Sequence, residues 1–352
     1  MKRKVLLLTA MVVSLIVPMA IYANDFSQAE VSDTETKALF FGLNGSAFPV
    51  EPVAGLPAGW NSDPNFDDSS WSLAFLFQDP AYLDPTTIPL FIENGANWIS
   101  ISSNGLGLDS DQIDGSRGVY LYRKTFQVPA TALNLSADVG IAADNYGWLY
   151  VNGVEVLEPL DTNENDRNFL SPPSLSSILP KLLVCNNVIA AEVQNGCGDC
   201  GGESIIPNGP TATIFAMQLN YGLPDVVWRP PITLGSIHKN GSTIPIKFRL
   251  FTQEGKLIKS MRDVYLAIHE GGFSDPLGNI VIQWQLGNGV RHMRFAKGEG
   301  QYIVNFQTQK LNLESGEYTA VVHDGCTQEV LGYIEFQLGS PKDKGKDKGK
   351  KK

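Results

Sequence analysis

The chain has 352 residues, a hydrophobic content of 43% and a formal net charge of −10. This length fits about two domains of ~150 residues, and the hydrophobic content is high enough for buried cores, which excludes a wholly disordered chain. A basic leader and a basic tail carry positive charge, which leaves −18 on the body between them. Such an acidic body repels phosphates, so it excludes nucleic acid as a partner and remains compatible with divalent cations and neutral polymers.

The N-terminus has the pattern of a secretory signal peptide over residues 1–23. A short basic stretch precedes an apolar run that closes on small residues at Ala23, and this pattern directs export and cleavage. The run is shorter than the ~20 residues of a spanning helix, so we predict cleavage rather than a retained anchor. We expect a chain with no further transmembrane segment, secreted or held at a bacterial-type cell surface, with residues 24–39 as a flexible N-terminal segment.

The residues after this segment predict a β-sandwich over 40–222. Apolar residues come in short alternating runs separated by Gly, Asn, Asp and Pro, the pattern of sandwiches and barrels. In chain order, strands are predicted over residues 119–126, 133–141, 148–151, 154–156, 188–193 and 212–219. Asn152-Gly153, between the third and the fourth, is a strong signal for a two-residue hairpin turn.

Four motifs of this unit follow one another in a characteristic order. They are Trp60 with Phe66–Trp71, then Tyr122–Phe126, then Ala143–Gly153, then Asn187–Val193. This order resembles the galactose-binding-like jelly roll, a β-sandwich that accompanies many glycoside hydrolases and surface proteins. The resemblance implies the fold more firmly than the ligand, because many members bind carbohydrate and many only support a neighbouring domain. The glycine usual before the fourth motif is absent here, where the sequence is Cys185-Asn186-Asn187.

Prolines make residues 223–231 a predicted linker, because proline stops helices and central strands alike. The second unit, residues 232–340, contains Gly241–Phe248, which ends in Pro-x-Lys-Phe, and a later Gly-Glu-Tyr strand. It resembles the PxKF immunoglobulin-like domain of bacterial secreted proteins, which implies a spacer without chemistry of its own. The lysine-rich tail, residues 341–352, is predicted to be disordered, either as a solubilising end or as a contact for anionic surfaces. The predicted fold class is therefore all-β, two β-sandwiches in tandem after a signal peptide.

Candidate ligand contacts lie in the first unit. Aromatic rings stack on the apolar face of a sugar, and amides or carboxylates bond its hydroxyls. The residues of these types that we select are Trp98, Asp144, Asn145, Tyr146 and Trp148. The alternative for the tryptophans is a place in the sandwich core, because Trp60, Trp71 and Trp148 fall in family motifs where an aromatic normally fills it.

Two acidic turns are candidates for structural calcium, which members of the galactose-binding-like family often carry. The first supplies side-chain oxygens at alternate positions, as the first half of a calcium loop does, from Asp161, Asn163 and Asn165. The second contains Asp109, Asp111 and Asp114. The first departs from the EF-hand pattern, since Asp166 replaces the glycine and Pro172 the closing glutamate. The alternative is two hydrated acidic loops.

The four cysteines fit an oxidising compartment. Cys185, Cys197 and Cys200 lie close together, and Cys326 lies far away in the sequence. We expect at least one disulfide within the group of three. Which two pair, and whether the third reaches Cys326, stays open.

No pattern of catalytic residues stands out. The four histidines are isolated, and no nucleophile elbow or phosphate-binding glycine loop occurs, so we predict that the chain is not an enzyme. We expect an extracellular non-catalytic binding protein, whose jelly roll recognises a carbohydrate, a cell-wall polymer or another surface ligand, with the second unit as spacer. The alternative is a structural or adhesive surface or matrix protein with no small-ligand site, and self-association is open.

Overall fold

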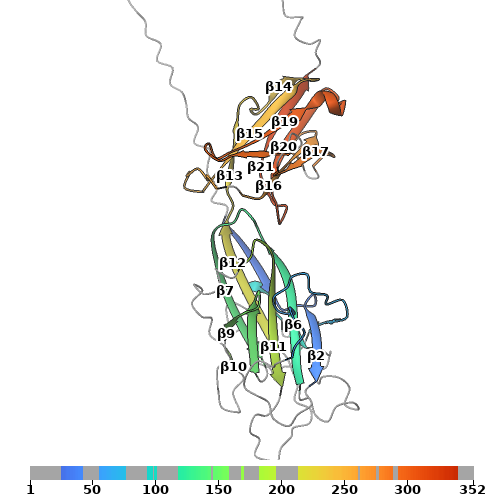
Figure 1. Cartoon of the computed structure of the whole chain (residues 1–352), viewed down its shortest axis with the longest axis vertical. Coiled ribbons are helices and arrows are strands. Elements are labelled where there is room, and N and C mark those ends of the chain that lie inside the picture. Colours follow the sequence, from blue (N-terminus) through green and yellow to red (C-terminus); the bar gives the residue numbers. More distant parts are fainter. Residues whose placement is uncertain are drawn as a thin grey trace, which may run out of the picture.

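The computed structural model describes residues 25–42, 55–76, 93–97, 99–100, 118–143, 146–157, 168–169, 182–195, 213–260, 262–274, 277–287 and 292–339. These residues form two β-sandwiches that lie one above the other along the long axis of the molecule (Figure 1). The prediction of an all-β, β-sandwich fold is confirmed. Within this part of the chain, the search for a helix of sufficient length and hydropathy to cross a membrane finds none.

The first sandwich consists of two antiparallel sheets. The β12 sheet has the order β10-β7-β12-β5-β4, with β1 also paired to β12. Its strands are β1 (Asp25–Val31), β4 (Phe75–Leu76), β5 (Ile99–Ser100), β7 (Leu133–Ala143), β10 (Asn168–Phe169) and β12 (Thr213–Gly222). The β11 sheet has the order β3-β2-β6-β11-β8-β9. Its strands are β2 (Lys37–Gly42), β3 (Ser72–Leu73), β6 (Gly118–Val128), β8 (Tyr146–Val151), β9 (Val154–Leu157) and β11 (Cys185–Asn195).

The second sandwich also has two sheets. The β15 sheet has the order β13-β15-β19-β18 and contains β13 (Asp225–Arg229), β15 (Thr243–Phe251), β18 (Arg294–Ala296) and β19 (Gln301–Gln307). The β20 sheet has the order β14-β21-β20-β16-β17 and contains β14 (Ser236–Lys239), β16 (Val264–Glu270), β17 (Ile280–Gln285), β20 (Gly316–Asp324) and β21 (Val330–Gly339). A 3₁₀ turn, η4 (Thr308–Leu311), follows β19.

Side-chain alternation explains why both faces of the β11 sheet are buried. Successive side chains of a strand point to opposite faces, and in β11 Ile189 and Ala191 face the core between the two sheets. Val188 and Ala190 face the other way, where Trp60 and its neighbours from the segment before β3 cover them. A strand buried on both faces is apolar throughout, as β11 is over most of its length.

The predicted hairpin turn is present. Asn152 and Gly153 join β8 to β9 and both have positive φ, 51° and 76°. A type I′ turn requires positive φ at both central residues, and Asn-Gly adopts this conformation at little cost. Gly153 also has no room for a side chain, because an added Cβ would lie 2.6 Å from the Cβ of Ser62.

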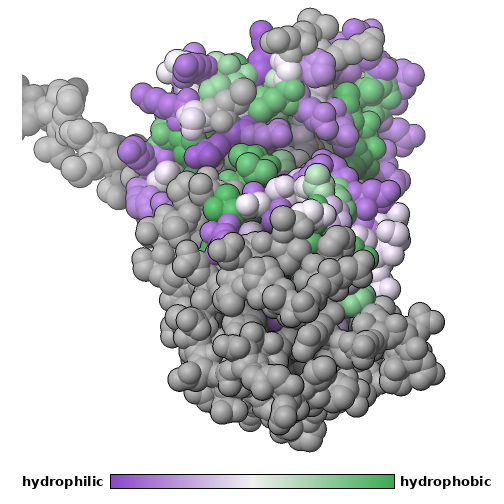
Figure 2. Space-filling model, turned by 60° about the horizontal axis from the view of Figure 1, so that its bottom comes forward, coloured by the Kyte–Doolittle hydropathy of each residue, from purple (hydrophilic) through white to green (hydrophobic). Residues whose placement is uncertain are grey.

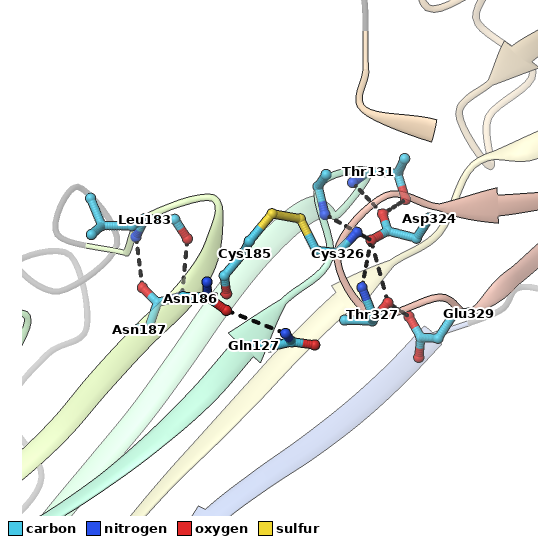
Figure 3. The surroundings of a disulfide bond; sticks show 11 residues. Gln127, Thr131, Leu183, Cys185, Asn186, Asn187, Asp324, Cys326, Thr327 and Glu329 are labelled. Atoms are coloured by element: carbon cyan, nitrogen blue, oxygen red, sulfur yellow. Dashed lines mark hydrogen bonds between the residues drawn. A yellow bond between two sulfur atoms is a disulfide. The ribbon is translucent and has the colours of Figure 1, made fainter. Parts of the chain in front are cut away.

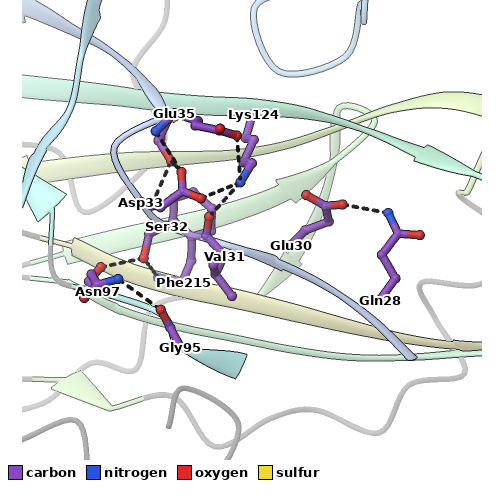
Figure 4. A network of polar contacts seen from close by, with 11 residues as sticks. Gln28, Glu30, Val31, Ser32, Asp33, Glu35, Gly95, Asn97, Lys124 and Phe215 are labelled. Carbon is purple, nitrogen blue, oxygen red and sulfur yellow. Dashed lines mark hydrogen bonds and ion pairs between the residues drawn. The ribbon is translucent and has the colours of Figure 1, made fainter. Parts of the chain in front are cut away.

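The expected flexible segment over residues 24–39 is corrected, because β1 and the start of β2 lie within it. β1 pairs with β12 in one sheet and β2 with β6 in the other, so the chain crosses between the sheets at residues 32–36. Figure 4 shows the polar contacts that fix this crossing. The Ser32 hydroxyl accepts from the backbone N–H of Phe215 at 3.1 Å, and Lys124 binds Asp33 at 2.7 Å. The crossing is therefore bonded to both sheets.

The expected linker over residues 223–231 is also corrected. Asp225–Arg229 forms β13, which pairs in register with β15. The prolines that suggested a linker flank this strand, with Pro224 before it and Pro230 and Pro231 after it. β13 is an edge strand, where a strand is free to end at a proline.

Candidate functional site at the distal end of the first sandwich

The ends of five strands, β6, β7, β8, β11 and β12, meet at the end of the first sandwich that lies away from the second; we call it the distal end. The pairing places Ala143 opposite Thr213, Gly118 opposite Asn195, and Tyr146 opposite Gln194. The opposite ends of β7, β6, β11 and β12 lie next to the second sandwich (Figure 1). In the view of Figure 2 the coloured surface, on which polar and apolar residues are interspersed, lies above the grey atoms.

The sequence candidates are attached to these strand ends. Asp144 and Asn145 connect β7 to β8, Trp98 directly precedes β5, and the two acidic turns lie between β5 and β6 and between β9 and β10. Trp98, Asp144, Asn145, Asp109, Asp111, Asp114, Asp161, Asn163 and Asn165 themselves lie outside the described residues, as do Cys197 and Cys200. Ala143 and Tyr146, the described neighbours of Asp144 and Asn145, lie at the distal end, as do Gly118 and Asn168, which follow the two acidic turns in the sequence.

A buried carboxylate lies on the outer face of the β11 sheet near this end. Glu192 is fully buried, and its two oxygens accept hydrogen bonds from Gln194 Nε2 at 3.0 Å and from the Tyr150 hydroxyl at 3.5 Å. Burial, and then the Glu192 charge, raise the pKa of Tyr150, so this phenol stays protonated and acts as a donor. A buried charge is costly unless it is hydrogen-bonded, and these two donors meet that need in part.

Trp148 is buried in the structure and is not in a position to contact a ligand. Its side chain is 2% exposed and packs in the outer-face cluster with Trp60, Trp71 and Tyr150. A ring buried in this way offers no free face for a sugar, so the expectation is corrected in favour of a core role. Tyr146 starts β8, and its backbone pairs with Gln194.

Arg123 holds the covering segment on this outer face. The guanidinium, 1% exposed, donates from Nε to the Trp60 carbonyl at 3.0 Å and from Nη2 to the Asp63 carbonyl at 2.9 Å. Nη1 pairs with the Asp68 carboxylate, and the guanidinium carbon lies 5.3 Å from the centre of the Phe66 ring. All three guanidinium nitrogens are thus bonded to one segment, and this geometry is structural rather than ligand-binding.

The other end of the first sandwich is joined to the second by a disulfide. Cys185, at the start of β11, bonds Cys326 in the turn after β20, 141 residues away (Figure 3). The sequence left open which cysteine of the group of three reaches Cys326, and the structure shows that it is Cys185. A pair inside that group would have to join Cys197 to Cys200, both outside the described residues.

Asp324 lies beside this disulfide and bonds both sandwiches (Figure 3). Oδ2 accepts from the backbone N–H and the hydroxyl of Thr131, at 2.8 and 2.7 Å, and Oδ1 from the N–H of Ala130 at 3.2 Å. Oδ1 also accepts from the N–H groups of Cys326 and Thr327, at 2.8 and 3.0 Å. The carboxylate is fully buried. Together with the disulfide it forms what we call the joint.

Sequence reasoning missed Glu192, Arg123 and Asp324, although two of them leave a signal. Arg123 and Glu192 are charged residues inside otherwise apolar strands, at positions where the alternation predicts burial. A charge in such a place needs a partner, which marks it as a candidate for a buried polar contact. Asp324 leaves no comparable signal, because its partners in the first sandwich are almost two hundred residues away.

The described ranges contain no group of three or more His, Cys, Asp or Glu side chains that could hold a metal cofactor. Both acidic turns lie outside those ranges, so structural calcium stays a prediction.

Comparison with known proteins gives matches only at the level of structure. No family model matches the chain, and no curated protein is significantly similar to it. A β-glucuronidase from Ruminococcus gnavus, in complex with N1-substituted uronic isofagomine, is 14% identical with a TM-score of 0.28, covering 90% of this chain and 46% of the enzyme. The Bacteroides uniformis β-glucuronidase is 13% identical with a TM-score of 0.28, covering 89% of this chain and 32% of the enzyme. The chain thus spans less than half the length of these proteins.

These matches correct one expectation. The proteins matched are β-glucuronidases, so the expectation of a purely non-catalytic binding protein, together with its structural or adhesive alternative, is not retained. At these identities and TM-scores the likeness assigns no activity or substrate to this chain.

Proposed function

We propose that this chain has a carbohydrate-related function and that the distal end of the first sandwich is the part that contacts the carbohydrate. The observation that carries the proposal is the convergence of strand ends: the described residues on either side of Asp144 and Asn145, and those that follow the two acidic turns, lie at this one end. Loops that a rigid sheet positions are the usual place for binding residues. The joint covers the opposite end, which leaves the distal end as the one available for a large ligand.

Export is part of the proposal. The disulfide between Cys185 and Cys326 supports an oxidising compartment, where such bonds form and persist, and the leader at residues 1–23 has the pattern that directs a chain there. The galactose-binding-like and PxKF assignments are proposed for the two sandwiches on the motifs quoted above. A glycan or a cell-wall polymer outside the cell is then the proposed partner.

A glycan array and a hydrolysis assay test this function together. The full chain is screened for competable binding and for product release from chromogenic glycosides, a β-glucuronide among them. Asp144→Ala, in the turn at the distal end, is compared with Asp138→Ala, an acidic position on the preceding strand β7. Binding that Asp144→Ala removes and Asp138→Ala keeps supports the proposal. No competable binding and no product release would overturn it.

The hydrolysis assay also tests the prediction that the chain is not an enzyme, which stays a prediction. Glu192 is the buried carboxylate nearest to the distal end in the described residues, and Glu155 on β9 is exposed. Product release that Glu192→Gln abolishes and Glu155→Gln retains would show a catalytic carboxylate. Binding without release in the same assay would agree with the prediction.

A further inference from the structure

Two histidines of the second sandwich lie on the outer face of the β20 sheet. β16 and β20 are antiparallel, with Tyr265 opposite His323 and His269 opposite Thr319. Because side chains alternate along a strand, the odd-numbered residues of both strands share one face. The two histidine rings lean toward each other over the sheet, and their centroids are 6.4 Å apart.

A hydrogen bond to a backbone carbonyl fixes each of the two rings. His269 Nδ1 lies 2.9 Å from the Gly278 carbonyl oxygen, and His323 Nδ1 lies 3.0 Å from that of Gln328. A carbonyl only accepts, so each Nδ1 carries the hydrogen and each Nε2 of the neutral ring carries a lone pair. Tyr265 stacks on the His323 ring with centroids 4.6 Å apart and holds its plane.

The carbonyl contacts also set the direction of the two lone pairs. Gly278 lies beyond the end of β16 and Gln328 beyond the end of β20, and these are opposite ends of the antiparallel pair. In an imidazole ring the two nitrogens face away from each other, so each Nε2 is directed back toward the middle of the pair. The residues paired there are Ala267 and Val321, on the same face of the sheet as the two histidines.

The His269 Nε2 atom is unusual for a buried group. The side chain is 6% exposed, and Nε2 has no hydrogen-bond partner among the described residues. His323 is almost as buried, at 9%. Buried polar atoms are nearly always bonded to protein, water or an ion, so a buried lone pair directed at a second lone pair indicates a bridging species between them.

We propose that His269 and His323 bind one transition-metal cation through their Nε2 atoms. Imidazole nitrogens suit Zn²⁺, Cu²⁺ and Ni²⁺, and metal-bound histidines commonly donate their other ring N–H to a backbone carbonyl, as both do here. With two protein ligands, water fills the remaining positions, so binding is weak and reversible. Ca²⁺ and Mg²⁺ prefer oxygen ligands and do not bind, which separates this site from the calcium predicted in the first sandwich.

Calorimetry of the full chain with Zn²⁺ alone tests this site. We expect one saturable binding event that His269→Gln and His323→Gln each remove. His292→Gln is the matched control, because His292 is exposed and far from the pair in sequence. Ca²⁺ should give no heat at this site, and Zn²⁺ binding should weaken in acid, where protons compete for the histidines. No saturable binding, or binding that both variants retain, overturns the proposal.

A second measurement needs no variant at the site. With histidine-labelled full chain, Cu²⁺ should broaden the ring signals of two histidines selectively, at concentrations that leave the other two sharp. The unaffected pair should be His238 and His292, identified by His238→Gln and His292→Gln. Broadening of all four signals in parallel, or of His292 first, would show adventitious binding only and overturn the proposal.

Discussion

Asp324 of the second sandwich and Thr131 of the first are joined by two hydrogen bonds to the same carboxylate oxygen, at 2.8 Å from the backbone N–H and 2.7 Å from the hydroxyl. The carboxylate is fully buried, and bonds to an ionised acceptor are about twice as strong as neutral ones. Leu133 extends the contact, because it packs in the core of the second sandwich although it starts β7 of the first. The two sandwiches are therefore fixed to each other.

Replacing Asp324 should loosen the joint. Asp324→Ala removes the common acceptor and leaves buried N–H groups of both sandwiches unbonded, at a cost of about 2–4 kcal/mol in the free energy of unfolding. Chemical denaturation measures this loss, and small-angle scattering should show a wider range of orientations. Glu329→Gln is the control, since Glu329 is in the same turn and its carboxylate accepts from the hydroxyls of Thr327 at 3.1 Å and Tyr221 at 3.5 Å, for which glutamine keeps an acceptor oxygen. Equal stability of Asp324→Ala and the wild type would contradict a role in the joint.

Reduction of the Cys185–Cys326 bond should also destabilise the chain. The bond closes a segment of 141 residues, and closing a long loop restricts the unfolded chain by about 3–5 kcal/mol. A calorimetric scan of Cys185→Ser with Cys326→Ser should therefore show a lower melting temperature, and reductant should lower the melting temperature of the wild type but not of this double variant. Mass mapping of non-reduced peptides that joined Cys185 to Cys197 or Cys200 would contradict the pairing.

Arg123→Met should destabilise the first sandwich. The change leaves the Trp60 and Asp63 carbonyls without their donor and Asp68 without its cation, and breaking a buried ion pair in this way costs about 3 kcal/mol. Arg249→Met is the control, because its partner Glu299 is 3.9 Å away and 64% exposed, so its loss should cost less than about 1 kcal/mol. Urea titration measures the free energy of unfolding of both variants. Similar losses of stability for the two would contradict the structural role of Arg123.

Local pattern was enough to predict much of the fold. The alternation in β7 and β11 and the Asn152-Gly153 turn are local properties, because they depend on residues a few positions apart. β1 was missed because its residues are partly exposed and polar, so the strand depends on pairing with β12, almost two hundred residues later. β13 was missed because prolines flank it directly on both sides.

The site was less predictable, for a related reason. The sequence selected residue types that suit sugar and calcium but could not bring them together, and only the register of the strands shows which strand ends share the distal end. Trp148 was selected as an aromatic, although its position in the alternation equally suits burial. The partner of Cys185 is distant in the sequence, and proximity along the chain favoured the wrong neighbours.

The pH dependence of stability should depend on His323. Burial is the main cause that lowers its pKa, with the nearby His269 ring acting in the same direction and the Gln328 carbonyl against it. Because the pKa is lower in the folded than in the unfolded chain, the unfolded state binds more protons below about pH 6.5. Stability is therefore full above that pH and is lost as the pH falls toward the folded-state value.

Denaturation from about pH 8 to about pH 5, a range in which histidine changes charge, tests this dependence with chelator present to exclude bound metal. The wild type should lose stability toward acid, and His323→Gln should lose less, because glutamine takes up no proton. Glu30 and Asp225, whose pKa values burial raises, act with the opposite sign: their protonation favours the folded state as the pH falls. They are unchanged in the variant, so the difference between the two curves isolates His323. His292→Gln, at an exposed position, should follow the wild type. Parallel curves for His323→Gln and the wild type would contradict the assignment.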